Sequence, residues 1–97
     1  MECEVTTRKI KFRFHAIQRM FERNISTEDV LNVISNGKVI KEYYEDKPYP
    51  SKLILGFINE LPIHVVLAEN EHDNEQIVIT VYSPQTELWD TSFERKK

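Results

Sequence analysis

Apolar and polar residues alternate near the start of the chain. Between residues 8 and 14, the apolar Ile10, Phe12 and Phe14 are separated by basic residues. A period of two is typical of a half-buried strand, here with a basic outer face. The same pattern also fits an extended arm that leads into the next element, and the sequence leaves both readings open.

The spacing of apolar residues becomes helical from residue 15 onward. Ile17, Met20 and Phe21 stand at positions i, i+3 and i+4, which predicts the core-facing stripe of a helix over residues 15–24. Asn24 is suited to the left-handed backbone on which helices commonly end. We therefore expect a short helix whose buried side is formed by this stripe.

A second helix is predicted directly after the first. Ser26 can cap its free amide groups, and Asp29 stands three residues later in a pattern that resembles a capping box. Gly37 is the expected C-terminal stop of this helix. Its apolar stripe is formed by Val30, Val33 and Ile34.

The remainder of the chain has the composition of strands separated by turns. Four strands are predicted, at residues 39–44, 52–58, 63–69 and 76–83. Prolines mark a turn over residues 46–50, and Asn59 and Glu60 mark a tight reversal. Strands that follow one another through short turns favour an antiparallel meander.

These elements predict an α+β fold in one domain that spans residues 1–97. Two N-terminal helices pack on one face of a four-stranded, mainly antiparallel sheet, to which residues 8–14 add a further N-terminal strand if they pair. A C-terminal helical turn is predicted around Leu88, Trp89 and Phe93. The ends at 1–7 and 94–97 are expected to fray.

Composition and charge limit the classes of protein to which the chain is expected to belong. The chain has 97 residues, a net charge of −3 and a single cysteine, so an internal disulfide is excluded. No apolar run is long enough to cross a membrane, and the N-terminus does not resemble a signal peptide, so a cytoplasmic protein without membrane contact is expected. The net charge hides a local value of +5 over residues 8–23, which keeps a nucleic-acid partner open.

The most specific candidate site lies within this basic segment. His15, Arg19 and Arg23 follow one another at steps of four and share one face of the predicted helix. Arginine binds phosphate oxygens through a planar fork, and histidine exchanges a proton near neutral pH. RNA supplies its own nucleophile, the 2′-hydroxyl group, so the pattern fits RNA cleavage. Alternatively, the arginines pair with carboxylates of the sheet and His15 packs at the helix start.

Further candidate residues lie on or beside the strands. Alternation places His64 on the opposite face of its strand from Ile63 and Val65, where it is a second candidate for proton transfer or a histidine at the edge of the core. Candidates for contact with the base or phosphate of a substrate, or for strand stabilisation alone, are Tyr43, Tyr49, Ser51, Lys52 and Tyr82.

Neither a metal nor an organic cofactor is expected. The residues Cys3, His15, His64 and His72 have no spacing typical of metal ligands. The acidic segment over residues 69–75 lacks the glycine and the spacing of a calcium loop. No glycine-rich phosphate loop is present either.

Several segments together resemble the domain-of-unknown-function 4258 family. They follow the signature H-A-x-x-R-M-x-x-R-x-I and cover roughly residues 12–84. The matching segments are His15-Ala-Ile-Gln-Arg-Met-Phe-Glu-Arg-Asn-Ile25, residues 26–30, residues 36–40, Tyr49-Pro-Ser51 and residues 62–66.

The resemblance implies a place near the RelE- and BrnT-like toxins, many of which cleave RNA without a metal. It implies a RelE-like fold, and the matching positions are His15, Arg19, Arg23, Tyr49, Ser51 and His64, whose roles are inferred from their chemistry. The expected function is a metal-independent RNA endonuclease of the toxin type, and the alternative is a protein- or RNA-binding module without catalysis. Candidate partners are RNA, an antitoxin-like protein and a second copy of the chain.

Overall fold

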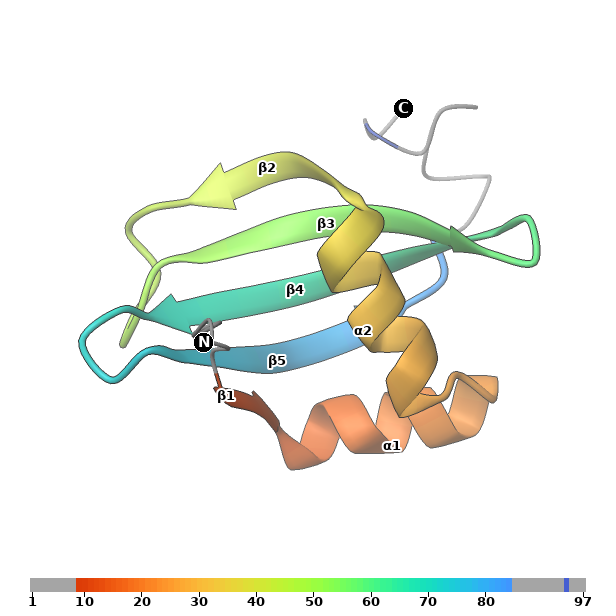
Figure 1. The fold of residues 1–97 in the computed structure, drawn as a ribbon, viewed down its shortest axis with the longest axis horizontal. Helices are drawn as coiled ribbons and strands as arrows, with labels where there is room; N and C mark the ends of the chain where they lie inside the picture. Colours follow the sequence, from red (N-terminus) through yellow and green to blue (C-terminus); the bar gives the residue numbers. More distant parts are fainter. Residues whose placement is uncertain (1–8, 85–93, 95–97) are drawn as a thin grey trace, which may run out of the picture.

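The computed structural model describes residues 9–84 and residue 94. It contains two helices and five strands, which Figure 1 shows as a sheet with the helices packed against it. In chain order the elements are β1 (Lys9–Phe12), α1 (Phe14–Arg23), α2 (Thr27–Asn36), β2 (Lys38–Tyr43), β3 (Ser51–Ile58), β4 (Leu61–Asn70) and β5 (Glu75–Tyr82).

The five strands form one mixed sheet in the order β1-β5-β4-β3-β2. Strands β2 to β5 form the predicted antiparallel meander, and β3 reverses into β4 at Asn59 and Glu60, which both adopt positive φ angles. The alternating residues near the N-terminus form a strand and not an extended arm, because β1 pairs in parallel with β5. The α+β prediction is therefore confirmed, and the sheet has five strands where the sequence predicted four and left the fifth open.

The N-terminus of α2 has the predicted capping box. The Ser26 hydroxyl accepts a hydrogen bond from the Asp29 amide at 3.0 Å, and the Asp29 carboxylate accepts one from the Ser26 amide at 3.1 Å. Both donors would otherwise lack a partner in the first helical turn. The cap depends only on residues three apart, which is why the sequence could predict it.

The predicted buried face of α1 is wrong in two of its three positions. The helix ends at Asn24 in the left-handed conformation, as expected, but it turns Ala16 and Met20 toward the core. Ile17 and Phe21 are 49% and 87% exposed. The small Ala16 side chain allows close approach to the sheet, so α1 buries only a narrow strip and leaves the rest of its apolar arc outside.

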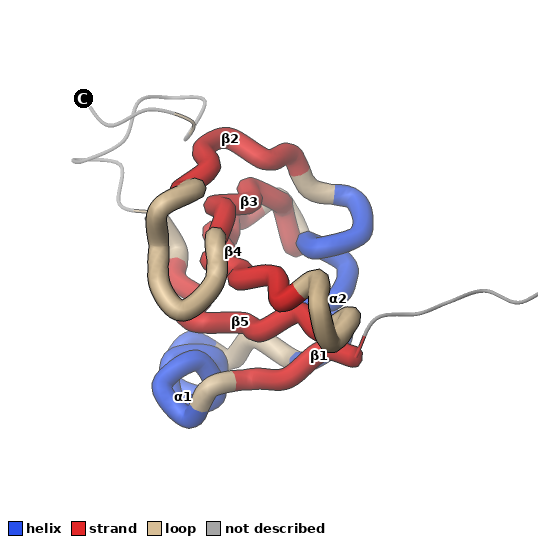
Figure 2. Tube along the Cα trace, turned by 90° about the vertical axis from the view of Figure 1, so that its left-hand side faces the viewer, coloured by secondary structure: helices blue, strands red, loops and turns tan. Residues whose placement is uncertain are grey.

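Both helices pack into one core with a single face of the sheet. Helix α2 crosses this face while α1 continues from β1 alongside β5, as Figures 1 and 2 show. The buried residues that form this core are Ala16, Met20, Val30, Val33, Ile54, Ile63, Val65, Leu67, Val78 and Val81. The alternation predicted for β4 is confirmed, since its odd-numbered positions from 63 to 67 face the helices.

The predicted helical turn around Leu88, Trp89 and Phe93 lies outside the described residues, as does the segment 1–7. Glu94 is described, and its carboxylate pairs with the Lys38 ammonium group at 3.0 Å. This contact places residue 94 beside the start of β2. No helix in the described part of the chain is long and apolar enough to cross a membrane.

Candidate functional site

The predicted set His15, Arg19 and Arg23 lies on one polar flank of α1. His15 and Arg23 are exposed, and Arg19 is partly exposed. The Arg19 guanidinium contacts the Glu22 carboxylate at 3.2 Å, a surface ion pair within the same helix. Such pairs contribute little energy, so the guanidinium group can exchange this carboxylate for a bound phosphate. The three side chains form an accessible row of one imidazole and two guanidinium groups.

The C-terminal end of this flank meets the end of β5. Arg23 lines a pocket of about 250 Å³ together with residues from the α1–α2 turn and the β3–β4 hairpin, and Ser83 is part of the same lining. Ser83 directly follows Tyr82 in the chain. The row of basic groups on α1 therefore ends near the strand end that carries the Tyr82 phenol.

His64 and Tyr82 form a pair on the sheet face that is turned away from the helices. They stand opposite each other in neighbouring strands, with His64 Nδ1 3.2 Å from the Tyr82 phenol oxygen. Their rings pack edge to face, with centroids 5.2 Å apart. The His64 side chain is fully buried. Its imidazole ring therefore has no direct access to a substrate, and the Tyr82 phenol is the group it can orient.

Tyr43 lies close to this pair. Burial raises the pKa of Tyr82 above its ordinary value, and the neighbouring Tyr43 phenol raises it further. Tyr43 comes from β2, which is separated from β5 by two other strands. The Lys41 ammonium group lies 5.4 Å from the centroid of the Tyr43 ring.

Replacement of Tyr82 by phenylalanine should lower the free energy of unfolding by about 1 kcal/mol at neutral pH, because His64 loses a hydrogen-bond partner. The raised pKa of Tyr82 means that the folded chain holds the phenol proton more tightly than the unfolded chain. This stability is complete below the ordinary tyrosine pKa of 10.0 and is lost as the pH rises through the folded value. The difference between wild type and Tyr82→Phe should therefore shrink above pH 10.

Urea denaturation at a series of pH values from neutral to strongly alkaline measures this difference. Tyr49→Phe is the matched control, because Tyr49 lies in the turn before β3 and its loss leaves the His64–Tyr82 pair intact. If the difference in free energy of unfolding between wild type and Tyr82→Phe stays constant through the alkaline range, the attribution of this stability to the protonated Tyr82 phenol is wrong.

Ser51 and Lys52 lie in a more acidic environment. The buried Ser51 donates a hydrogen bond to the Asp46 carboxylate, and the Lys52 ammonium group pairs with Glu69 at 3.2 Å. Both residues line a pocket of about 200 Å³, whose remaining lining includes Glu42, Glu69 and Glu71. This surface is less suited to a phosphate than the flank of α1, because carboxylates repel an anion.

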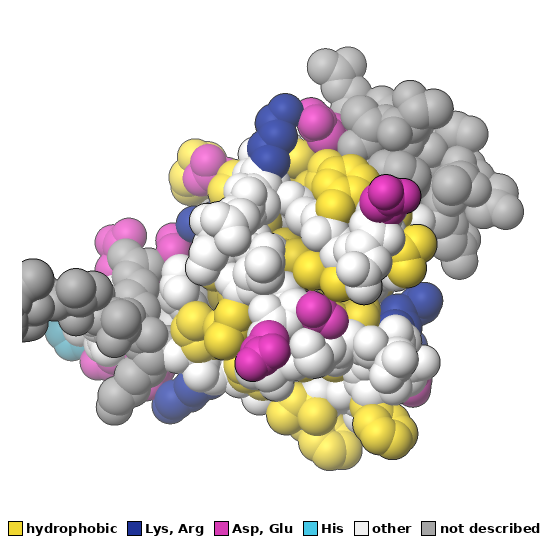
Figure 3. Space-filling view, turned by 45° about the vertical axis from the view of Figure 1, so that its right-hand side comes forward, with side chains coloured by type: hydrophobic (Ala, Val, Ile, Leu, Met, Phe, Trp, Pro, Cys, Tyr) yellow, Lys and Arg dark blue, Asp and Glu magenta, His cyan; other side chains and the backbone are white. Residues whose placement is uncertain are grey.

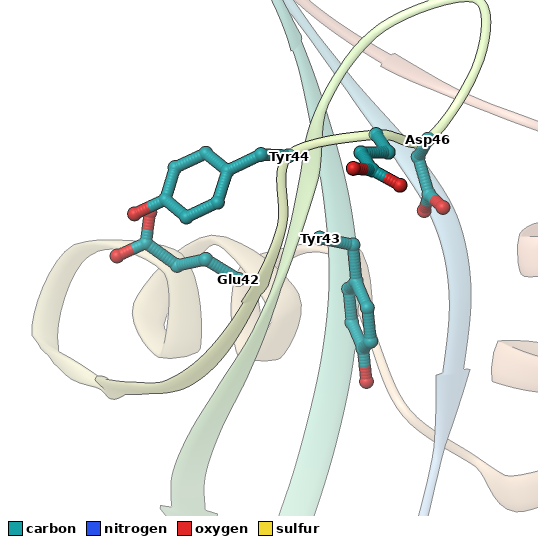
Figure 4. A pocket seen from close by; sticks show the side chains of 5 residues that line it. Glu42, Tyr43, Tyr44 and Asp46 are labelled. Carbon is teal, nitrogen blue, oxygen red and sulfur yellow. The ribbon is translucent and has the colours of Figure 1, made fainter.

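A second acidic pocket of about 400 Å³ lies at the end of β2, and Figure 4 shows the side chains that line it. The Tyr44 and Glu42 side chains point toward each other, while Tyr43 points to the other side of the strand. A hydrogen bond with the Glu42 carboxylate, together with its negative charge, raises the pKa of Tyr44. Glu45 and Asp46 complete a lining that repels an anionic backbone.

The described residues contain no group of three or more histidine, cysteine, aspartate or glutamate side chains placed to hold a metal ion. His72 is exposed in the turn between β4 and β5. Cys3 lies outside the described part of the chain.

The family model described as Domain of unknown function (DUF4258) matches residues 12–83. The chain belongs to the DUF4258 family. The match begins at the last residue of β1 and extends through Tyr82, so both the flank of α1 and the His64–Tyr82 pair belong to the DUF4258 domain. Comparison with curated proteins finds no match, and comparison with solved structures finds none either.

One residue of the DUF4258 domain near the candidate site was not singled out from the sequence. Lys41 lies beside Tyr43 and adds a cation to the sheet face that carries Tyr82. The signal was present in the alternation at the end of β2, where residues 41 and 43 share a face. A bulge in the pairing of β2 with β3 sits between residues 39 and 41, so alternation over the whole strand would not have placed Lys41 correctly.

Proposed function

We propose that the chain is a metal-independent RNA endonuclease of the toxin type. The observation that carries this proposal is the exposed row of His15, Arg19 and Arg23 on one flank of α1. Cleavage of a phosphodiester requires charge neutralisation and a proton acceptor, and these three side chains supply both within about two and a half turns of one helix. The family resemblance of the signature around His15 supports the same function.

The proposed reaction uses the RNA as its own nucleophile. His15 in its neutral form accepts the proton of a 2′-hydroxyl group, and the 2′-oxygen attacks the adjacent phosphorus. Arg19 and Arg23 bind the phosphate oxygens and stabilise the negative charge that grows on them in the transition state. The bond to the 5′-oxygen breaks, and this oxygen takes a proton from water. The hydroxide that remains takes the proton held by His15, which returns the imidazole to its neutral form. The products are a 2′,3′-cyclic phosphate and a 5′-hydroxyl end.

The sheet face turned away from the helices supplies the contacts with the bases. The phenols of Tyr43 and Tyr82 offer stacking surfaces, which is how unpaired RNA bases are commonly held. His64 acts as a positioning residue, since its buried ring contacts Tyr82 and not the solvent. The acidic pockets around β2 and β3 repel the RNA backbone and thereby direct it toward α1. Tyr43 lines one of these pockets, so only an uncharged base would approach it there.

Incubation of the purified full chain with cellular RNA in excess EDTA tests this function. Both free RNA and translating ribosomes serve as substrates, and DNA of the same base sequence is the control. We expect RNA fragments with cyclic phosphate ends and intact DNA. Salt-dependent RNA binding without any product would instead indicate a binding module. Cleavage that appears only after a divalent metal is added would contradict the proposed chemistry.

A further inference from the structure

A line of large apolar side chains runs along the outside of α1. Phe14, Ile17 and Phe21 are 75%, 49% and 87% exposed, and their spacing of three and four residues places them on one side of the helix. Ala16 and Met20 occupy the core-facing side. Figure 3 shows hydrophobic side chains gathered at the lower edge of the molecule, where α1 lies. Single exposed apolar residues are common, but an aligned set with two phenylalanines indicates an interaction surface.

The charge around this line is positive at its N-terminal end. Arg13 precedes Phe14, is exposed, and has no ion pair within the described part of the chain. No side chain caps the N-terminus of α1, and its first turn contains no acidic residue. The positive end of the helix dipole therefore adds to the charge of Arg13 and remains uncompensated by side chains of α1.

We infer that Phe14, Ile17 and Phe21 form a docking surface for an acidic, amphipathic segment of a partner protein. Apolar side chains of the partner cover the three residues, and its carboxylates lie against Arg13 and the N-terminus of α1. The line from Phe14 to Phe21 is about 10 Å long, so roughly two turns of a partner helix would cover it. This surface is separate from the flank of His15 and Arg19, and the inference does not depend on RNA cleavage.

Charge decides between this partner and a second copy of the chain. Two α1 helices packed side by side in parallel would bring Arg13 against Arg13. In antiparallel orientation Arg13 would meet the last turn, which holds both Glu22 and Arg23 and therefore offers no net opposite charge. Like charges across an interface oppose association, whereas an acidic segment meets opposite charge at the same place. The observations therefore favour a distinct acidic partner.

Two designed peptides of about 15 residues test this surface by fluorescence anisotropy against the full chain. They share one helical pattern of leucines and differ only in glutamate or lysine at all other charged positions. We expect saturable binding of the glutamate peptide that is at least tenfold tighter than that of the lysine peptide. Phe21→Ser should weaken it at least tenfold, and Arg13→Glu should abolish the preference for glutamate.

Phe57→Ser is the matched control, because Phe57 is also exposed but lies on β3. It should leave binding unchanged. Equal binding of both peptides, no saturable binding, or equal losses in Phe21→Ser and Phe57→Ser would overturn the inference. A dimer in light scattering that Phe21→Ser dissociates would assign the surface to a second copy and would also overturn it.

Discussion

Replacement of His15 by alanine is expected to lower the rate of RNA cleavage by about 10²- to 10⁴-fold, the usual contribution of a general base. The reason is chemical, since the 2′-hydroxyl group becomes a strong nucleophile only as it loses its proton. His15 is exposed on α1 and makes no contact on which the core depends, so the variant should fold as the wild type does. Cleavage rates in EDTA at fixed RNA concentration measure the effect.

His72→Ala is the matched control for this variant. His72 is exposed as well, but it lies in the turn between β4 and β5, away from the flank of α1. The control should cleave RNA at the wild-type rate, and circular dichroism should show the same fold for all three proteins. Equal activity of His15→Ala and wild type would remove His15 from the site.

Replacement of Gly37 by alanine is expected to lower the free energy of unfolding by about 3 kcal/mol, the upper part of the range for steric overpacking. A Cβ atom at this position would lie 2.4 Å from the Val33 carbonyl oxygen and 2.6 Å from the Leu55 carbonyl oxygen. Both are backbone atoms, so relief requires that α2 move relative to β3. Urea denaturation measures the loss as a lower midpoint.

Two variants provide the comparison for Gly37→Ala. Ser35→Ala, at an exposed position of α2, should change stability by less than about 0.5 kcal/mol. Gly56→Ala should be milder than Gly37→Ala, because its closest contacts are with the side chain of Val33. A stability of Gly37→Ala equal to that of Ser35→Ala would contradict the close packing of α2 on β3.

Features that depend on neighbours in sequence could be predicted, whereas features that depend on packing between elements could not. The two helices show both cases. The cap at Ser26 and the end of α2 at Gly37 depend only on residues nearby in sequence. Gly37 nevertheless adopts an extended backbone, and its lack of a Cβ atom is what allows α2 to approach β3 closely. The buried side of α1 is not local, because it depends on how β1 pairs with β5. The apolar arc of α1 is broad enough that its pattern alone could not separate Met20 from Phe21.

The same distinction applies to the candidate site. Steps of four residues were sufficient to place His15, Arg19 and Arg23 on one flank. The contact between His64 and Tyr82 depends on the register of β4 with β5, and this register shifts between Val66 and Leu67. Alternation could give the face on which His64 lies, but not its complete burial.

The most direct test of the proposed function compares an RNA oligonucleotide with its fully 2′-O-methylated counterpart, both incubated with the wild-type chain and translating ribosomes in excess EDTA. Methylation removes the 2′-hydroxyl proton that His15 would accept and leaves the phosphate charges unchanged. The proposal predicts cleavage of the unmodified RNA with 2′,3′-cyclic phosphate ends and an intact methylated RNA. Cleavage of both RNAs, or of neither, would contradict it.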